Sequence, residues 1–338
     1  MNMKKKFVII LIVILSLALI SCLVYFVVRQ SGKNKLTQND KIPSLPPNEE
    51  NSVVVDEAEY SVKYNGKKYA YNKNMINVLF IGIDTDKKSE ETLYGNGGQS
   101  DVLLLSCINP DTDEVKIISI PRDTISNVVV YDYKGEAVDT QRLPISLSHA
   151  YGDGGVKSAE LTVNSVSDLL YGLPIHAWFS FNVDAIKIIN DAVGGVPIVA
   201  DENNIALMPP GGEIGKESIL LDRYAKRFVI NRENSTDSER RIRQKQYLSS
   251  FVKQAKKAFV KNPFIVVDVY KRLNDYSLTS LTMDEIVWLA GEVSDMEISM
   301  DFTALKGKEI QGETMTEFHV DDAMLYETML DIFYIEVE

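Results

Sequence analysis

The chain has 338 residues, of which 45% are hydrophobic and 25% are charged, and this composition is typical of a globular protein with one large domain or two small ones. It excludes a disordered chain, a collagen and a small disulfide-stapled protein. The net charge of -12 disfavours a nucleic-acid partner, because phosphate neutralisation needs a basic face. The two cysteines, Cys22 and Cys107, are too few for a thiolate metal cluster, and we do not expect them to form a disulfide.

An uncharged segment lies close to the N-terminus. Residues 7–28 carry no charged side chain, and a helix of this length spans roughly the 30 Å of a hydrocarbon core at about 1.5 Å per residue. Three lysines precede it and one arginine follows, so the positive-inside rule predicts a cytoplasmic tail at residues 1–6, a transmembrane anchor at 7–28 and an extracellular remainder. The sequence around Cys22 also resembles a lipoprotein cleavage site, and cleavage there would likewise leave the protein tethered to the cell membrane.

The composition changes after the apolar segment. Residues 29–60 are polar and contain a proline cluster at 43–47, which predicts an extracellular stalk that packs poorly. No internal repeat and no second linker follow. Residues 61–338 are therefore expected to form one domain.

Three short apolar runs open this domain, at residues 77–83, 102–108 and 115–120. Residues 109–114 between the last two runs are rich in Asn, Pro and Asp, which predicts an antiparallel hairpin. Helical spacing follows at 155–171 and 184–193, and short strands are predicted at 178–181 and 196–199. This alternation indicates an α/β fold, an α-β-α sandwich with a central mixed sheet, preceded by the transmembrane helix.

The C-terminal third is predicted to be mostly helical. The sequence Thr236 to Glu239 has the form of a capping box and opens a helix that ends at Asn262-Pro263. A second capping box at 282–285 precedes apolar residues 286–293, and residues 321–333 form a last amphipathic helix. We expect these helices to serve mainly as scaffold.

Charged residues follow the ends of the first strands. If these strands are antiparallel, Asp84, Asp101 and Arg122 meet at one edge of the sheet. Two carboxylates so placed repel each other unless a cation lies between them, and hard oxygen ligands favour Mg²⁺ or Mn²⁺. Ordinary turn and cap aspartates would give the same pattern, and both interpretations stay open at this point.

Two basic features suggest an anionic ligand. The guanidinium of Arg122 can bind phosphate in a bidentate manner, and Asp123 beside it can hold that group in position; a surface salt bridge is the alternative. A second feature is the basic run at residues 223–245, in which Arg240 and Gln244 lie four positions apart and share a helix face. Such a run is compatible with a solvated helix face or with a polyanionic ligand.

Six short motifs follow one another along the domain, and they are Asn77 to Asp84, Gly98 to Asp101, Ile118 to Thr124, Ser148 to Gly152, Asn190 to Val196 and Arg240 to Gln244. Together they resemble the LytR-CpsA-Psr family of Gram-positive envelope proteins. Their order and spacing fit over about residues 75–260, and the combination is much more specific than any single motif.

The resemblance implies a phosphotransferase that moves an anionic glycopolymer, of the teichoic acid or capsular polysaccharide type, from a polyprenyl diphosphate carrier to peptidoglycan. It implies Mg²⁺ or Mn²⁺ as the cofactor. By family analogy the metal ligands are Asp84 and Asp101. The residues implied for catalysis are Arg122, Asp123, Arg240 and Gln244. Those implied for binding the diphosphate are Arg122, Arg232, Arg240, Arg243 and Gln244.

Two positions depart from the family pattern. Gln99 stands before the Ser-Asp pair where an arginine is usual, and Ile230 stands where the family has the first arginine of an Arg-x-Arg pair. Arg227, one helical turn before, offers a replacement for the missing charge. These departures leave two other functions open, a non-catalytic protein that binds polyprenyl-linked polymer and a polyprenyl diphosphate pyrophosphatase.

Overall fold

The computed structural model describes residues 30–37, 42–46, 55–56, 61–85, 92–231, 233, 237–312 and 315–337. The predicted cytoplasmic tail and transmembrane anchor lie outside these ranges. Within them, no helix combines the length and the apolar character that a membrane crossing requires.

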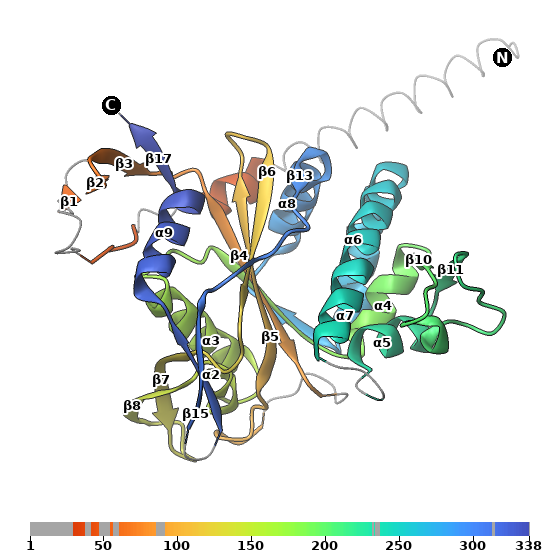
Figure 1. Cartoon of the computed structure of the whole chain (residues 1–338), viewed down its shortest axis with the longest axis horizontal. Coiled ribbons are helices and arrows are strands. Elements are labelled where there is room, and N and C mark those ends of the chain that lie inside the picture. Colours follow the sequence, from red (N-terminus) through yellow and green to blue (C-terminus); the bar gives the residue numbers. More distant parts are fainter. Residues whose placement is uncertain are drawn as a thin grey trace, which may run out of the picture.

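A mixed sheet forms the centre of the molecule, as predicted (Figure 1). Its strands lie in the order β12-β9-β4-β5-β6-β13, and β14 also pairs with β6. Strands β4, β5 and β6 are antiparallel neighbours, which confirms the predicted hairpin, and β9 runs parallel to β4. The strand bounds are β4 Ile76–Ile83, β5 Ser100–Asn109, β6 Glu114–Ile120, β9 Ala177–Asn182, β12 Ser277–Thr279, β13 Glu297–Ile298 and β14 Thr303–Ala304.

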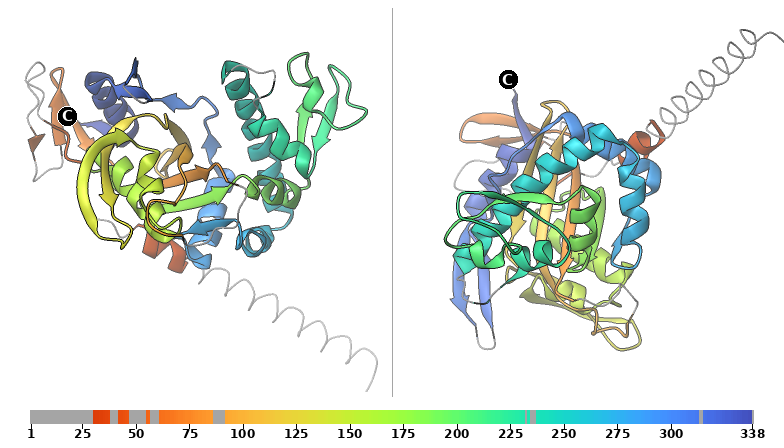
Figure 2. Two further views of the ribbon diagram at one scale, coloured as in Figure 1. Left: turned by 90° about the horizontal axis from the view of Figure 1, so that it is seen from below. Right: turned by 90° about the vertical axis from the view of Figure 1, so that its right-hand side faces the viewer.

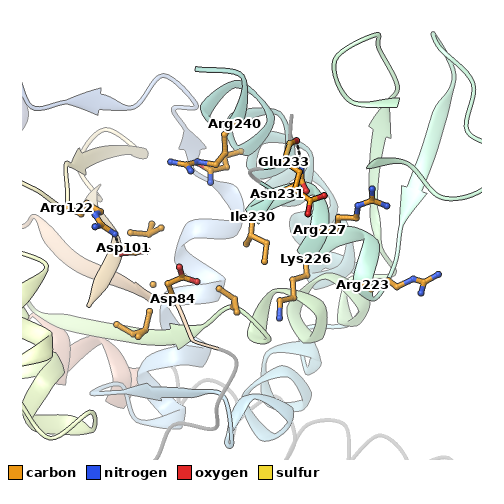
Figure 3. Close-up of a pocket in the computed structure, with 15 residues that line it drawn as sticks. Asp84, Asp101, Arg122, Arg223, Lys226, Arg227, Ile230, Asn231, Glu233 and Arg240 are labelled. Atoms are coloured by element: carbon orange, nitrogen blue, oxygen red, sulfur yellow. Dashed lines mark hydrogen bonds and ion pairs between the residues drawn. The ribbon is translucent and has the colours of Figure 1, made fainter. Parts of the chain in front are cut away.

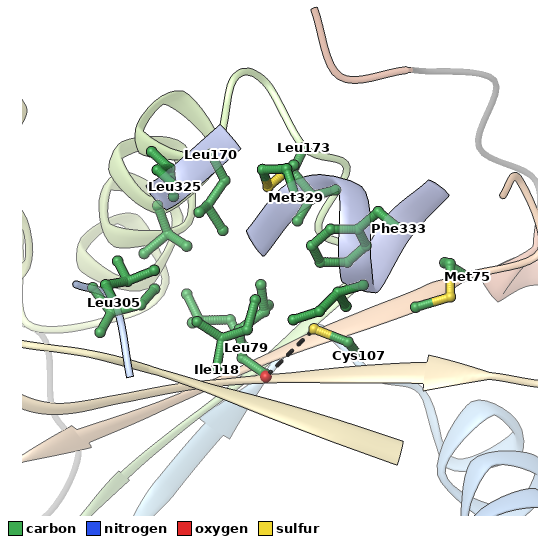
Figure 4. Close-up of a cluster of buried hydrophobic side chains, with 14 of the residues drawn as sticks. Met75, Leu79, Cys107, Ile118, Leu170, Leu173, Leu305, Leu325, Met329 and Phe333 are labelled. Atoms are coloured by element: carbon green, nitrogen blue, oxygen red, sulfur yellow. Dashed lines mark hydrogen bonds between the residues drawn. The ribbon is translucent and has the colours of Figure 1, made fainter. Parts of the chain in front are cut away.

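Helices cover both faces of this sheet (Figures 1 and 2). On β4, Leu79 and Ile81 point into a core shared with α3 and α9, whereas Ile76 and Val78 point toward α8 on the other face, as the two-residue period of a strand requires. Figure 4 shows the first of these cores, where side chains of α9 cover the sheet. The helix bounds are α2 Leu147–Ala150, α3 Val156–Leu169, α4 Ala185–Ala192, α5 Arg223–Ile230, α6 Asp237–Lys261, α7 Ile265–Leu273, α8 Met283–Asp295 and α9 Asp322–Phe333.

The C-terminal third contains more strand than the sequence predicted. Helices α6, α8 and α9 match expectation, and α8 opens with the predicted capping box at Thr282 and Glu285. Strands β12 to β17 were not predicted, because most are short and pair with distant partners.

The remaining strands lie outside the central sheet. They are β1 Val55–Asp56, β2 Ser61–Tyr64, β3 Lys67–Tyr71, β7 Ile125–Tyr131, β8 Ala137–Pro144, β10 Val196–Val199, β11 Glu217–Leu220, β15 Gly307–Gln311, β16 Thr316–Val320 and β17 Tyr334–Val337.

The segment expected to be a poorly packing stalk contacts the domain wherever the structure describes it. Residues 30–36 are helical, and Lys35 forms an ion pair of 2.9 Å with Asp284 at the start of α8. Leu36 and Leu45 are each only 4% exposed and belong to the two cores beside the sheet. The expectation was wrong for these residues, because a few apolar side chains suffice to fix an otherwise polar segment.

This packing predicts a stability contribution from the segment. We expect Leu36→Ala and Leu45→Ala each to lower the free energy of unfolding by about 2–4 kcal/mol, as buried leucines do. Leu93→Ala is the matched control, because Leu93 is 70% exposed and should cost less than about 0.5 kcal/mol. Urea unfolding of the three variants measures both values, and equal stability of all three would show that the segment does not contribute.

A partly buried histidine predicts acid sensitivity. Nδ1 of His176 accepts a hydrogen bond of 3.0 Å from the backbone N–H of Asn77, and burial lowers the pKa of His176 to about 4. The unfolded chain binds this proton from about pH 6.5 downward, so stability is complete above that pH. It should fall by on the order of 3 kcal/mol as the pH drops from about 6.5 to about 4.

Urea unfolding at about pH 7.5 and about pH 5 tests this expectation. His176→Asn keeps an acceptor near the same place and cannot titrate, so its stability should change less between the two pH values. A wild-type protein that is equally stable at both would contradict the assignment.

Candidate functional site

Three sequence-predicted residues meet at one edge of the central sheet. Because β5 is antiparallel to β4 and β6, the end of β4, the start of β5 and the end of β6 lie together, and they bring Asp84, Asp101 and Arg122 into the lining of one cavity of about 750 Å³. Figure 3 shows Asp84 and Asp101 on this sheet side of the cavity, with Arg122 beside Asp101. The predicted convergence is confirmed.

A β-bulge places Asp101 in the cavity. Gly82 pairs with Val102 whereas Ile83 pairs with Ser100, so Asp101 is the extra residue opposite β4. Bulges of this kind redirect a side chain and are frequent beside functional sites. Gly82 suits the close approach of the strands, since a Cβ atom there would lie 3.0 Å from Cβ of Val102.

Arg122 connects the two carboxylates that flank it. Its Nη1 atom forms a short ion pair with Oδ1 of Asp101, and its Nε atom donates to Oδ1 of Asp123 at 3.4 Å. The side chain of Arg122 remains 41% exposed, whereas that of Asp101 is 15% exposed. Asp123 does not line the cavity, and its ion pair with Nε of Arg122 joins two side chains that are about 40% exposed. This contact is compatible with both interpretations of the sequence, and part of the guanidinium stays accessible to an anion.

Two helices form the opposite wall. Arg240 and Gln244 lie on one face of α6 and both line the cavity, as do Lys226 and Arg227 of α5. Figure 3 shows Arg240 across the cavity from Arg122. This arrangement places guanidinium groups on two sides of the same space, where both can bind one anionic group.

Contacts between the two helices fix this wall. Gln244 Nε2 donates to the carbonyl of Val229 at 3.1 Å, so it joins α6 to the last turn of α5. Lys226 donates to Asp184 just before α4 at 3.0 Å. Unpaired carbonyl groups at a helix C-terminus commonly accept such side-chain donors.

Arg243 occupies a different place from the one that the family analogy implied. It is 3% exposed, and its guanidinium donates to the carbonyls of Phe228 at 3.3 Å and Asn231 at 2.7 Å. It is absent from the cavity lining. The assignment as a diphosphate ligand is therefore corrected: Arg243 is a buried structural residue that holds the end of α5 against α6. Arg232 lies outside the described residues.

The cavity is basic in an acidic protein. Among the described residues its lining includes five bases, Arg122, Arg223, Lys226, Arg227 and Arg240, against three acids, Asp84, Asp101 and Glu233. The whole chain carries -12. This local excess of positive charge favours an anionic occupant.

The two departures from the family pattern have different positions. Ile230 lines the cavity, and so does Arg227, which supports the expected replacement of the missing charge from one turn away. Gln99 is exposed in the loop before β5.

One lining residue, Val183, was not predicted from the sequence. It directly follows β9, and the parallel pairing of β9 with β4 brings it beside Thr85.

A second cavity of about 440 Å³ lies between the sheet and helices α6, α7 and α8. Val78, Phe80, Phe179, Phe251 and Leu289 are among its mainly apolar lining residues. Of the described residues that line it, Lys256 alone is charged, and its amine donates to the carbonyl of Met296. This cavity was not predicted from the sequence, because its described lining residues come from eight elements that are far apart in the chain, β4, β5, β9, β13, α4, α6, α7 and α8.

The two cavities follow one another along the same elements. On β4, Val78 and Phe80 line the apolar cavity and Gly82 lines the basic one, and these alternate residues share one face of the strand. On α6, Arg240 and Gln244 line the basic cavity, and Phe251 to Phe259 line the apolar one. From Gln244 to Phe259 the helix rises about 22 Å. The site therefore suits an amphiphile with a charged head and a long apolar tail.

The carboxylates fit a divalent cation only together with other ligands. No group of three or more potential metal-binding side chains occurs within the residues that the structure describes. Asp84 and Asp101 nevertheless line the same basic cavity. Magnesium is commonly held by one or two carboxylates, with water and substrate phosphate completing its shell, and the observed pair fits that pattern.

Comparison with known proteins finds relatives that are named as teichoic acid transferases. The polyisoprenyl-teichoic acid–peptidoglycan teichoic acid transferase TagU of Halalkalibacterium halodurans is 30% identical over 182 residues, which cover 53% of this chain and 52% of TagU. The chain thus spans about half the length of this curated relative. The TagU of Bacillus anthracis is 28% identical over 214 residues, 62% of each chain.

A solved structure shares the fold of this chain, and a family model identifies the family to which the chain belongs. TagT bound to LIIa-WTA superimposes with a TM-score of 0.56 at 20% identity, covering 77% of this chain and 90% of that chain. A second TagT structure, with bound octaprenyl pyrophosphate lipid, gives a TM-score of 0.53. The LytR_cpsA_psr family model matches residues 47–330, which include both cavities, and the chain therefore belongs to the LytR-CpsA-Psr family.

Proposed function

We propose that this protein transfers an anionic glycopolymer, of the teichoic acid or capsular polysaccharide type, from a polyprenyl diphosphate carrier to peptidoglycan. The observation that carries the proposal is that the basic and the apolar cavity are lined by successive residues of the same two elements, β4 and α6. The carrier has two parts in the same sequence as the cavities. Its charged diphosphate head matches the basic cavity, and its long apolar polyprenyl tail matches the apolar cavity. The names of the TagU relatives and of the TagT structure with octaprenyl pyrophosphate support the same substrate class.

The reaction is a displacement at phosphorus. A muramic acid hydroxyl attacks the phosphorus next to the glycan, the bond from that phosphorus to the bridging oxygen breaks, and polyprenyl monophosphate leaves. The hydroxyl proton is released to water. The product is a phosphodiester between glycopolymer and peptidoglycan, and negative charge accumulates on the leaving phosphate as the bond breaks.

The cavity residues are placed to stabilise this charge. Arg122 from the sheet side and Arg240 from α6 bind the diphosphate between them, and Gln244 adds an amide from the next turn of α6. Asp123 keeps the guanidinium of Arg122 in position. Preorganised donors of this kind stabilise developing charge without reorganisation during the reaction. Mg²⁺ or Mn²⁺ held by Asp84 and Asp101 would supply further neutralisation of the phosphate oxygens.

The proposed location is the outer face of the cell membrane. The uncharged residues 7–28 and the lysines before them favour a single-pass anchor with a cytoplasmic N-terminus. The domain would then face both the lipid-linked donor in the membrane and the peptidoglycan outside it.

A transfer assay with the full chain tests the proposal. The protein is incubated with a labelled glycopolymer on polyprenyl diphosphate and with peptidoglycan, and two products are measured: label bound to peptidoglycan and free polyprenyl monophosphate. Both should appear together. Binding without product would favour the non-catalytic function to which Gln99 and Ile230 point, and monophosphate without labelled peptidoglycan would indicate a pyrophosphatase.

A further inference from the structure

We infer that the corner between α6 and α7 is a membrane-docking surface that places the apolar cavity at the surface of an anionic lipid bilayer. This inference rests on the proposed function, because a bilayer is the source of the polyprenyl-linked donor. It concerns residues that take no part in binding the diphosphate.

Two large apolar side chains are exposed at this corner. Val260 in the last turn of α6 is 72% exposed, and Phe264 directly before α7 is 69% exposed. Their chain neighbours Phe259 and Ile265 line the apolar cavity. The exposed pair therefore lies at the end of the cavity that is farthest along α6 from Arg240 and Gln244, where a polyprenyl tail longer than the cavity would leave the protein.

The surroundings of the pair are basic. Lys253, Lys257 and Lys261 are exposed on α6 at intervals of four residues, so they form one row along the helix. Residues 253–272 contain six bases, which are these three together with Lys256, Lys271 and Arg272, against one acid, Asp268. Arg272 forms an ion pair with this acid at 3.0 Å.

This charge is opposite in sign to that of the chain as a whole, which is -12. Exposed aromatic and aliphatic side chains flanked by lysines are typical of surfaces that enter the interface of an anionic membrane. A protein partner would have to match the same row of lysines with acidic groups. The continuity of the corner with an apolar cavity favours lipid, because only lipid accounts for both features.

Fluorescence quenching tests the contact directly in the full chain. With Cys22→Ser as background, Phe264→Cys is labelled with an environment-sensitive dye, while Cys107 is buried and stays unlabelled. The protein is reconstituted in phosphatidylcholine vesicles with or without phosphatidylglycerol, and lipids with a nitroxide on the acyl chain serve as quencher. The control label is at Tyr133→Cys, because Tyr133 is 75% exposed in the turn between β7 and β8.

The label at 264 should be quenched strongly and the label at 133 weakly, and phosphatidylglycerol should increase the difference. Lys253→Gln, Lys257→Gln and Lys261→Gln together should remove that increase, because the row of charges is lost. Equal quenching at 264 and 133 would overturn the inference. Quenching at 264 that appears only after an acidic protein is added would indicate a protein partner instead.

An activity measurement separates this inference from the proposed function. Two transfer rates are measured, one with a long-chain donor in vesicles and one with a short-chain, water-soluble donor. The variant Val260→Ser/Phe264→Ser should lower the ratio of the first rate to the second by about tenfold, because it removes apolar surface that would be buried in the membrane. An unchanged ratio would contradict the docking surface even if both donors react. If the wild-type protein uses neither donor, the proposed function fails, whereas the quenching result still decides the membrane contact.

Discussion

Arg122→Ala and Arg240→Ala are each expected to lower affinity for the polyprenyl diphosphate by about 10- to 100-fold. Each change removes a charge-assisted contact from a partly desolvated cavity, a loss of roughly 1.5–3 kcal/mol. Arg122 should be the more sensitive of the two, because its removal also leaves Asp101 without its ion pair. Calorimetric titration with a polyprenyl diphosphate measures the loss.

Lysine at the same positions gives a sharper test of geometry. Arg122→Lys and Arg240→Lys keep the positive charge but lose the bidentate guanidinium, so they should recover only part of the affinity. The control is Lys63→Ala, which removes an exposed base on β2, away from the cavity. Full recovery with lysine would mean that charge alone matters, and unchanged affinity in Arg122→Ala would refute the site.

Asp84→Asn and Asp101→Asn are expected to weaken Mg²⁺ binding by about tenfold or more when a polyprenyl diphosphate is present. Each substitution removes one of the two aspartate carboxylates on the sheet side of the cavity, and magnesium depends on such hard, charged oxygen ligands. In the wild-type protein Mg²⁺ should bind much more weakly without the diphosphate, because phosphate oxygens complete its shell. Calorimetry with Mg²⁺ in both conditions measures this coupling independently of turnover.

The matched control for the metal experiment is Glu160→Gln, an exposed acid on α3. It changes the net charge by the same amount without altering the cavity. If Glu160→Gln weakens Mg²⁺ binding as much as Asp84→Asn does, the effect comes from overall charge, and the two aspartates are not metal ligands.

The sequence by itself determined the central strands and three residues of the site. The apolar runs at 77–83, 102–108 and 115–120 are local patterns with a turn between the last two. Antiparallel pairing then fixes which strand ends are neighbours. Asp84, Asp101 and Arg122 could therefore be placed together on the condition that the first two strands are antiparallel, because each lies within two residues of the end of one of these runs, and the structure supplied that pairing.

Tertiary packing decided which basic residues reach the cavity. Arg240 and Arg243 lie three positions apart on α6, and the sequence offers no means to choose between them. The contact of α6 with the end of α5 turns Arg243 inward to the carbonyls of Phe228 and Asn231, whereas Arg240 lines the cavity. The orientation of a helix face depends on what it packs against, and that partner comes from another part of the chain.

Long-range contacts also decided the features that the sequence did not predict. The bulge at Asp101 is a mismatch between two strands, and β13 is a two-residue strand that exists only because β6 offers it an edge. The apolar cavity likewise has its walls on elements that are distant in sequence. A periodic pattern within one segment determines the type of that segment, but a cavity is determined by how several segments pack together.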